Sequence, residues 1–208
     1  MASTASIDPL DVSSFTALDA ALLRCDDACT RRLVRELDES DPALADHGAG
    51  VAAVAVAVGR RLQFGADRLE TVCRAALLHD VGKRLVPREL LVKPGVLSAP
   101  ERRVVEGHAA VGSVLLVQAG LLSEASIVRH HHERWDGTGY PDRLCGREIP
   151  LESRIILVAD TFDAMTSDRP YRAALSHEDA LEEIRLAAGS QLDPACVAVA
   201  LEVLGGAG

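Results

Sequence analysis

The sequence predicts an all-α protein, and three observations point to that fold class. Apolar residues recur at steps of three or four along long stretches, which is the pattern of the buried face of an amphipathic helix. Ser98 and Ser176 are each followed three residues later by an acid, a pairing typical of a capped helix start. Between such helix starts, the sequence shows no series of alternating strands joined by hairpin turns.

The first part of the chain is expected to form three helices. Apolar residues recur at helical spacing through residues 13–38. The next segment, 44–63, includes a run from Val51 to Val58 that alternates Ala and Val and would fit a buried strand by itself. The residues on either side of this run favour a helix over the whole segment. A third helix is expected over 67–81.

Five further helices are expected, and residues typical of helix starts and stops support their limits. Ser98 and Ser176 fit N-caps, and Asp193-Pro194 places proline in a first helical turn. Gly189 fits a helix stop. The expected helices lie near 99–118, 123–133, 152–167, 177–188 and 194–204.

Composition limits the classes of protein to consider. The chain has 208 residues and is 48% hydrophobic, which is enough for one sizeable core. Only 3% of the residues are aromatic, so Ala, Val and Leu must fill that core. The formal net charge of -9 argues against a nonspecific grip on duplex nucleic acid, since that requires a basic face. Any anionic ligand must therefore be met by local positive charge.

The N-terminus and the cysteines indicate in which cellular compartment the protein is expected. The five cysteines form no CxxC pair or regular framework, which favours a reducing environment. The N-terminus lacks the basic start and apolar core of a signal peptide, and no apolar run is expected to approach the roughly 20 residues of a membrane span. These features predict a cytoplasmic protein with no membrane partner.

Two histidine-containing segments indicate a metal site. The run His-His-Glu-Arg-Trp-Asp-Gly-Thr-Gly-Tyr-Pro occupies residues 131–141, and His79-Asp80 stands about fifty residues upstream with a lysine close behind. Neutral imidazole is the commonest protein ligand for transition metals. Long loops are expected directly after these motifs, over 83–97 and 134–150, where functional loops often lie. Together they suggest a metal site that faces an anion.

The spacing of the histidines suggests how such a site would be built. Six of the seven lie in the middle of the chain, roughly one helix or helix-loop apart. Side chains from several helices of a bundle can converge on a metal in the core. His79 and Asp80 are expected at the end of a helix, where adjacent side chains diverge by about 100 degrees. Asp80 could thus reach a second ion while His79 faces the first.

Six segments follow one another along the chain: His47, HDVGK at 79–83, His108, the run at 131–141, ADTFDAMT at 159–166 and DRPYR at 168–172. Their order and spacing resemble the HD-GYP family, a subgroup of the HD-domain metal-dependent phosphohydrolases. Several motifs in register are far more specific than one. The resemblance implies a single HD-type helical bundle, the HD-GYP catalytic domain, over 41–208. A short extension, a tail and a helix over 1–40, would precede it.

The resemblance also implies two divalent metal ions, iron or manganese, with Asp80 bridging them. Cobalt, nickel or zinc could bind similar ligands, so the metal identity stays open. Some family members hold a third ion through a glutamate four residues before the first histidine, where this chain has Ala43. Two ions are therefore expected. The implied ligands are His47, His79, Asp80 and Asp160 for one ion, and His108, His131 and His132 for the other.

The activity that the resemblance implies is hydrolysis of cyclic di-GMP to linear pGpG by a hydroxide activated between the two metals, with further cleavage to GMP left open. Asp80 and Lys83 would be catalytic. Arg172 stands where many relatives have lysine, a change that keeps the charge but alters the geometry of phosphate binding. The implied substrate-binding residues are Lys83, Arg169, Arg172, Gly137 and Tyr140.

Two alternative hypotheses stay open at this point. The first is a non-catalytic module that binds a cyclic dinucleotide or a GGDEF-domain partner. Ala43, and Gly48 where many relatives have serine, are the departures that keep it open. The second is an HD-type hydrolase of other nucleotides. The expected partners are a cyclic dinucleotide, a GGDEF-domain protein and a second copy of the chain in a homodimer.

Other polar residues receive weaker predictions. His130 and His177 match no ligand position and are expected to be structural or solvated. Asp163 and Asp168 are expected to be helix caps or solvated carboxylates. Glu133 is the residue for which the two interpretations balance, because it could either orient a ligand imidazole or have no role at the site.

Overall fold

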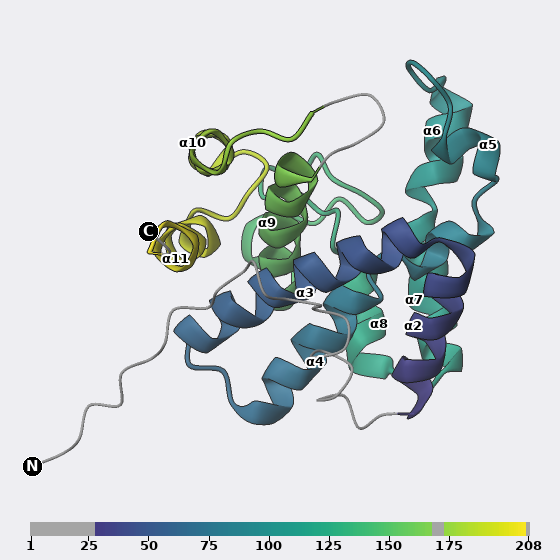
Figure 1. The fold of residues 1–208 in the computed structure, drawn as a ribbon, viewed down its shortest axis with the longest axis horizontal. Helices are drawn as coiled ribbons and strands as arrows, with labels where there is room; N and C mark the ends of the chain where they lie inside the picture. The colour runs from purple at the N-terminus through teal and green to yellow at the C-terminus, as the bar shows by residue number, and fades with distance from the viewer. Residues whose placement is uncertain (1–27, 168–172, 207–208) are drawn as a thin grey trace, which may run out of the picture.

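The computed structural model describes residues 28–167 and 173–206, which fold into a bundle of helices (Figure 1). This part of the chain contains no β-strand, and one isolated parallel bridge pairs Ala188 with Leu192. The predicted all-α fold class is confirmed. In chain order the elements are α2 (Ala28–Ser40), α3 (Pro42–Arg61), α4 (Ala66–Leu77), the 3-10 helix η2 (Val81–Leu85), α5 (Arg88–Leu91), α6 (Ala99–Glu106), α7 (His108–Gln118), α8 (Leu122–Arg129), the 3-10 helix η3 (Gly146–Glu148), α9 (Leu151–Thr166), α10 (His177–Ala187) and α11 (Pro194–Gly205).

Helix α3 crosses the middle of the bundle and packs against α2, α4, α9 and α11 (Figure 1). The alternating Ala and Val run is helical, and Val51, Ala55 and Val58 are buried in the core. Small side chains let the neighbouring helices approach closely. A Cβ atom at Gly48 would lie 2.9 Å from the backbone oxygen of Leu77, so the glycine at this position has a packing reason.

Helix α3 also has the length and apolar composition of a membrane-spanning helix, contrary to the expectation that no apolar run reaches that length. Within the bundle, 56% of its most apolar 18-residue window is buried. The central helix of a packed core meets the same criteria of length and composition. One such helix is therefore weak evidence for a membrane span.

The helix limits that rested on capping residues are confirmed. Ser98 accepts a hydrogen bond from the backbone of the third helical residue in a complete capping box at the start of α6. Ser176 caps α10 in the same position, and Asp193 caps α11, whose first residue is Pro194. Gly189 follows the end of α10 with a φ of +84°, in the left-handed region that glycine favours.

The single helix expected over 99–118 is wrong, because the chain forms two helices that meet at Gly107. The side chain of His108 explains part of the break. Its Nδ1 lies 2.7 Å from the backbone oxygen of Val105, a carbonyl that a continuous helix would use in its own ladder. The break turns the imidazole into the bundle.

Two other helices are shorter than expected. The helix expected over 67–81 ends at Leu77 and is followed by η2, and the one expected over 123–133 ends at Arg129. Both early ends place histidines in the turn after a helix instead of on the helix itself. Of the first expected helix, residues 13–27 lie outside the described part of the chain, and α2 is its described portion.

Helices α5 and α6 form an arm that projects from the rest of the bundle at the upper right of Figure 1. The segment 83–97, expected to be a loop, contains α5 and most of η2. Several apolar side chains of the arm face solvent, including Leu91, Val92 and Val96. The arm therefore presents apolar surface outside the core.

Candidate metal centre

Three buried histidines follow helix ends and make the same type of hydrogen bond. His79 follows α4, His108 follows α6 and His131 follows α8. In each ring, Nδ1 lies 2.6 to 2.7 Å from the backbone oxygen three residues earlier. Carbonyls in the last turn of a helix lack helical partners. Because a carbonyl oxygen only accepts, Nδ1 carries the proton and Nε2 keeps its lone pair for a metal.

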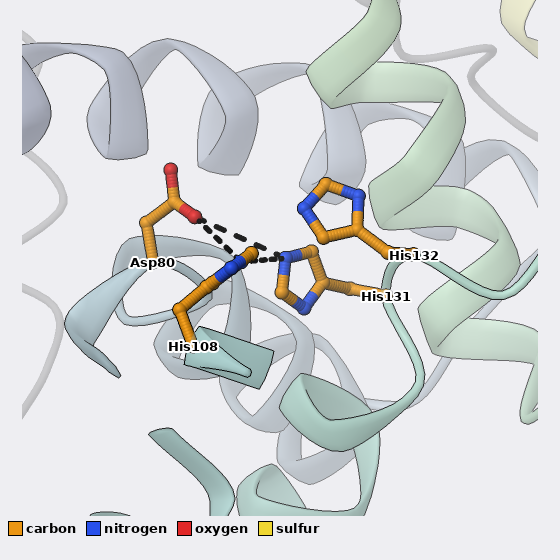
Figure 2. Close-up of side chains that lie close together, drawn as sticks. All are labelled: Asp80, His108, His131 and His132. Atoms are coloured by element: carbon orange, nitrogen blue, oxygen red, sulfur yellow. Dashed lines mark hydrogen bonds and ion pairs between the residues drawn. The ribbon is translucent and has the colours of Figure 1, made fainter. Parts of the chain in front are cut away.

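The free ring nitrogens of two of these histidines meet a carboxylate and a further imidazole, as Figure 2 shows. The Nε2 atoms of His108 and His131 lie 3.4 Å apart. Oδ1 of Asp80 lies 3.2 Å from Nε2 of His108 and 4.0 Å from Nε2 of His131. With His132, each residue of this group offers a ligand atom within 4.8 Å of the others. Four such groups could hold one metal ion.

A second group shares Asp80 with the first. His47, His79 and Asp80 offer ligand atoms within 4.8 Å of one another. Asp160 adjoins this group, because its Oδ1 lies 3.1 Å from Nε2 of His47, but it falls outside the 4.8 Å set. The carboxylate of Asp80 thus lies between two clusters of ligand-type atoms.

The segment η2 brings a cation against the shared carboxylate. Nζ of Lys83 lies 2.5 Å from Oδ2 of Asp80, and the lysine side chain stays partly exposed. Gly82 makes the position of η2 possible, because a Cβ atom there would lie 2.0 Å from the backbone oxygen of His108. The glycine therefore lets η2 pack directly on the start of α7.

Burial and neighbouring charges set the protonation of the cluster. Burial lowers the pKa of His132 to about 3, and it lowers the pKa of His131 well below its ordinary value. Burial would raise the pKa of Asp80, but the positive charge of Lys83 beside it holds that pKa well below its usual range. His131 and His132 therefore offer neutral imidazoles and Asp80 offers an ionised carboxylate, which are the forms that bind metals.

His47 is the exception among the imidazoles. Burial favours its neutral form, but hydrogen bonds to Asp160 and Asp163 raise its pKa to about 9. Burial favours the protonated form of Asp160, but the hydrogen bond from His47 lowers its pKa to about 2. A metal that binds His47 through Nε2 must therefore displace a proton.

Two orphaned polar atoms show that the cluster fits a metal ion. Nε2 of His79 and Oδ1 of Asp80 are buried and have no hydrogen-bond partner in the described protein. A buried polar atom without a partner costs on the order of 1–3 kcal/mol. Coordination would satisfy both atoms. Imidazole nitrogen and carboxylate oxygen without thiolate form a donor set suited to divalent first-row metals such as iron or manganese.

The loop after the paired histidines folds over the cluster. The ring centroid of Tyr140 lies 4.9 Å from that of His132 and 6.3 Å from that of His108. Gly139 allows this close return, because a Cβ atom there would lie 2.4 Å from the backbone nitrogen of Arg134. Gly137 has a φ of +76°, in the left-handed region. The structure thus brings Tyr140 to the edge of the metal cluster, whereas Gly137 lies in the same loop beside Cys145.

Glu133 and His130 hold this loop. Oε1 of Glu133 accepts a hydrogen bond of 2.6 Å from the backbone nitrogen of Asp142, so the structure gives this residue a partner in the loop instead of a ligand imidazole. Nε2 of His130 lies 3.0 Å from the Asp142 carboxylate, and Arg129 donates two hydrogen bonds of 2.7 Å to it. His130 is structural, as predicted.

The remaining predicted residues divide between the described and undescribed parts of the chain. Arg169, Arg172 and Asp168 lie outside the described residues. Nε2 of His177 lies 3.1 Å from the backbone oxygen of Leu204, which agrees with the predicted structural role.

The contact that Asp163 makes differs from its prediction. Its Oδ2 lies 2.6 Å from Nδ1 of His47, so the expectation of a helix cap or a solvated carboxylate was wrong. Asp160 and Asp163 are three residues apart on α9 and share a helix face. That spacing was the available signal, but it required knowing that α3 packs on this face.

The fold and the cluster define a class of protein, a helical bundle with a metal-binding centre of histidines and aspartates at its helix ends. Residues 31–196 match the model of a family described as HD domain. The chain belongs to the HD domain family. This assignment and the names of its relatives agree with the HD-GYP resemblance noted in the sequence.

Curated relatives match most of this chain. The chain is 39% identical over 173 residues to "Cyclic di-GMP phosphodiesterase response regulator RpfG" of Xanthomonas campestris, an alignment that covers 80% of this chain and 45% of the relative. It is 39% identical over 189 residues to "3'3'-cGAMP-specific phosphodiesterase 3" of Vibrio cholerae, covering 90% and 40%. The chain thus spans less than half the length of these relatives.

Solved structures share the fold at low sequence identity. A crystal structure of the V. cholerae cyclic GMP-AMP phosphodiesterase V-cGAP3 has a TM-score of 0.65 at 21% identity, covering 89% of this chain and 48% of that one. Bd1817, a HDG"Y"P protein from Bdellovibrio bacteriovorus, has a TM-score of 0.66 at 16% identity, covering 90% and 64%. These structures support the assignment of the fold.

Proposed function

We propose that this chain is a metal-dependent phosphodiesterase that hydrolyses cyclic di-GMP to linear pGpG. The observation that most directly supports this proposal is that Asp80 belongs to both groups of ligand-type atoms. From this position Asp80 could help to hold two ions, which would supply the activated water and the charge stabilisation that in-line phosphoryl displacement needs. The names of the relatives, which include cyclic di-GMP and 3'3'-cGAMP phosphodiesterases, support a cyclic dinucleotide as the substrate class.

The proposed ions are two divalent metals, iron or manganese. When bound, they would lower the pKa of water and polarise the phosphoryl oxygen. The proposed ligands are His47, His79, Asp80 and Asp160 on one side, and His108, His131 and His132 with Asp80 on the other. Lysine side chains bind phosphate as point charges, and Lys83 is held beside Asp80 with part of its side chain exposed.

Around the metals, the protein would bind and orient the substrate. Lys83 would neutralise a phosphate, and Gly137 and Tyr140 would contact the substrate from the loop. Arg169 and Arg172 are proposed as further phosphate ligands from the sequence. His131 is fully buried, so its side of the centre would exclude water.

The test is product chromatography after incubation of anaerobically purified, metal-counted protein with cyclic di-GMP and, in parallel, with 3'3'-cGAMP. Parent protein should form linear dinucleotide, and Asp80→Ala should form none and should bind less metal. Asp67→Ala removes an exposed carboxylate from the first turn of α4 and should leave turnover unchanged. A fully metallated parent that binds the dinucleotide without forming product would instead support the non-catalytic binding module.

Macromolecular partners and compartment are part of the same proposal. A cytoplasmic GGDEF-domain protein would supply the substrate, and this partner or a second copy of the chain would need an exposed docking surface. The apolar residues of the α5–α6 arm, such as Val92 and Val96, are 53% and 84% exposed. Sedimentation analysis of the chain alone and with a purified GGDEF domain would separate self-association from partner binding.

A further inference from the structure

His47 differs from the other histidines at the metal centre in the partner of its second ring nitrogen. His79, His108 and His131 each donate from Nδ1 to a neutral backbone carbonyl of their own segment. Nδ1 of His47 instead lies 2.6 Å from Oδ2 of Asp163, on another helix. Because the carboxylate only accepts, Nδ1 carries the proton and Nε2 is the nitrogen that can bind an ion.

Helix α9 contacts both nitrogens of this ring. Oδ1 of Asp160 lies 3.1 Å from Nε2 of His47, while Asp163 holds Nδ1 one turn further along α9. The imidazole is therefore fixed between two carboxylates of one helix face. Its side chain is 15% exposed, more than those of His79 and His131, so packing alone constrains it less.

The position of Asp163 depends on a glycine of the opposing helix. Gly50 lies three residues after His47 and thus on the same face of α3. A Cβ atom at Gly50 would lie 2.1 Å from Oδ1 of Asp163, well inside van der Waals contact. The glycine leaves the space that the carboxylate occupies. Ser167 also approaches the carboxylate, with its Oγ 3.4 Å from Oδ2.

We propose that Asp163 is a positioning residue that orients His47 toward the metal and strengthens it as a ligand, and that Gly50 provides the space for this contact. The inference rests on the proposed metal centre and adds a residue to it. A carboxylate on the outer nitrogen fixes the tautomer and the ring plane of a metal-bound histidine. Loss of the contact should weaken the ion on the His47 side.

The experiment is a titration of the metal-free full chain with Mn²⁺ alone, in which electron paramagnetic resonance counts the free ion. Asp163→Ala should weaken manganese binding about 10-fold to 100-fold, the usual effect of losing such a partner. Asp163→Asn keeps the shape and one accepting oxygen, so its loss should be smaller. Gly50→Ala keeps both His47 and Asp163 in the sequence, but the added Cβ pushes the Asp163 carboxylate away from His47. This variant should also weaken manganese binding.

The matched control is Asp142→Asn, which removes the negative charge from an aspartate–histidine contact of 3.0 Å at His130, outside both ligand groups. It should bind manganese as the parent does. Parent-like affinity in Asp163→Ala, or in Asp163→Asn and Gly50→Ala if the alanine variant does not fold, overturns the proposal. Equal weakening in Asp142→Asn also overturns it, because the effect would then not be specific to the metal centre.

The titration separates this proposal from the proposed activity. A parent that binds manganese but hydrolyses no cyclic dinucleotide contradicts only the activity, and the variants still decide the role of Asp163. A parent that binds no manganese contradicts the metal centre and the role of Asp163 with it.

Discussion

The metal-free protein should lose stability as the pH rises through the neutral range, because His47 holds a proton in the folded state. Its folded pKa is about 9, against 6.5 in the unfolded chain. A raised pKa contributes stability that is complete below pH 6.5 and is lost as the pH rises through about 9. The shift corresponds to about 3 kcal/mol, since one pKa unit is worth about 1.4 kcal/mol.

The acid side should behave in the opposite way. Burial keeps His131 and His132 neutral in the folded protein, with the pKa of His132 at about 3. Below pH 6.5 these two imidazoles bind protons in the unfolded chain but stay neutral in the folded protein. The free energy of unfolding therefore falls as the pH falls. For His132 the loss should be about 2 kcal/mol between pH 6.5 and 5, and His131 adds to it in the same direction. The metal-free protein is thus expected to be most stable near pH 6.5.

Urea denaturation of chelator-treated protein at pH 5, 6.5, 7.5 and 9 measures the loss of stability on the acid side and on the alkaline side. His47→Asn should abolish the alkaline loss, whereas His130→Asn, a histidine of equal 15% side-chain exposure that also contacts an aspartate, should keep it. Saturation with manganese should reduce the loss of stability between pH 6.5 and 9, because coordination already removes the proton from His47. A constant free energy of unfolding from pH 6.5 to 9 in the metal-free parent would refute the reasoning, as would an unchanged loss in His47→Asn.

Four further outcomes follow, three from the packing of the bundle and one from the metal centre. Gly82→Ala places a Cβ 2.0 Å from the backbone oxygen of His108, so we expect a loss of about 2 kcal/mol or more in urea denaturation. Gly205→Ala, whose Cβ meets nothing within 4 Å, should be neutral or stabilising in the same assay. Ser98→Ala removes the cap of α6 and should cost about 1 kcal/mol by the same measurement. Chelation should lower the thermal midpoint and abolish turnover, and added manganese should restore both, whereas a midpoint independent of metal would contradict a ligand set that includes buried His131.

The sequence predicted the elements of this fold wherever the signal was local. Periodicity and capping residues identified most helices, and Ser98 and Ser176 marked two starts correctly. The same evidence missed the cap of α3, where Asp41 accepts a hydrogen bond from the backbone of Leu44 and Pro42 fills the first turn. The pair Asp41-Pro42 is the same helix-start signal as Asp193-Pro194.

Contacts between segments far apart in the sequence explain what could not be predicted. The contact between Asp163 and His47 joins residues 116 positions apart, and no property of either segment alone encodes it. Gly50 carries the matching signal, but it can be interpreted only when the partner helix is known. Glu133 shows the same limit, because its partner is a backbone nitrogen of the returning loop, which the sequence does not locate.

The helix ends explain why the ligand histidines could be named from the sequence while their geometry could not. An expected helix over 99–118 would have placed His108 within a continuous ladder, where the carbonyl of Val105 is already engaged. The break at Gly107 frees that carbonyl for the imidazole, and the early ends of α4 and α8 do the same for His79 and His131. Each hydrogen bond both finishes a helix and turns Nε2 inward. The short helices and the ligand orientation therefore have one cause, so changes that extend a helix through its end should disorder the metal centre without touching a ligand.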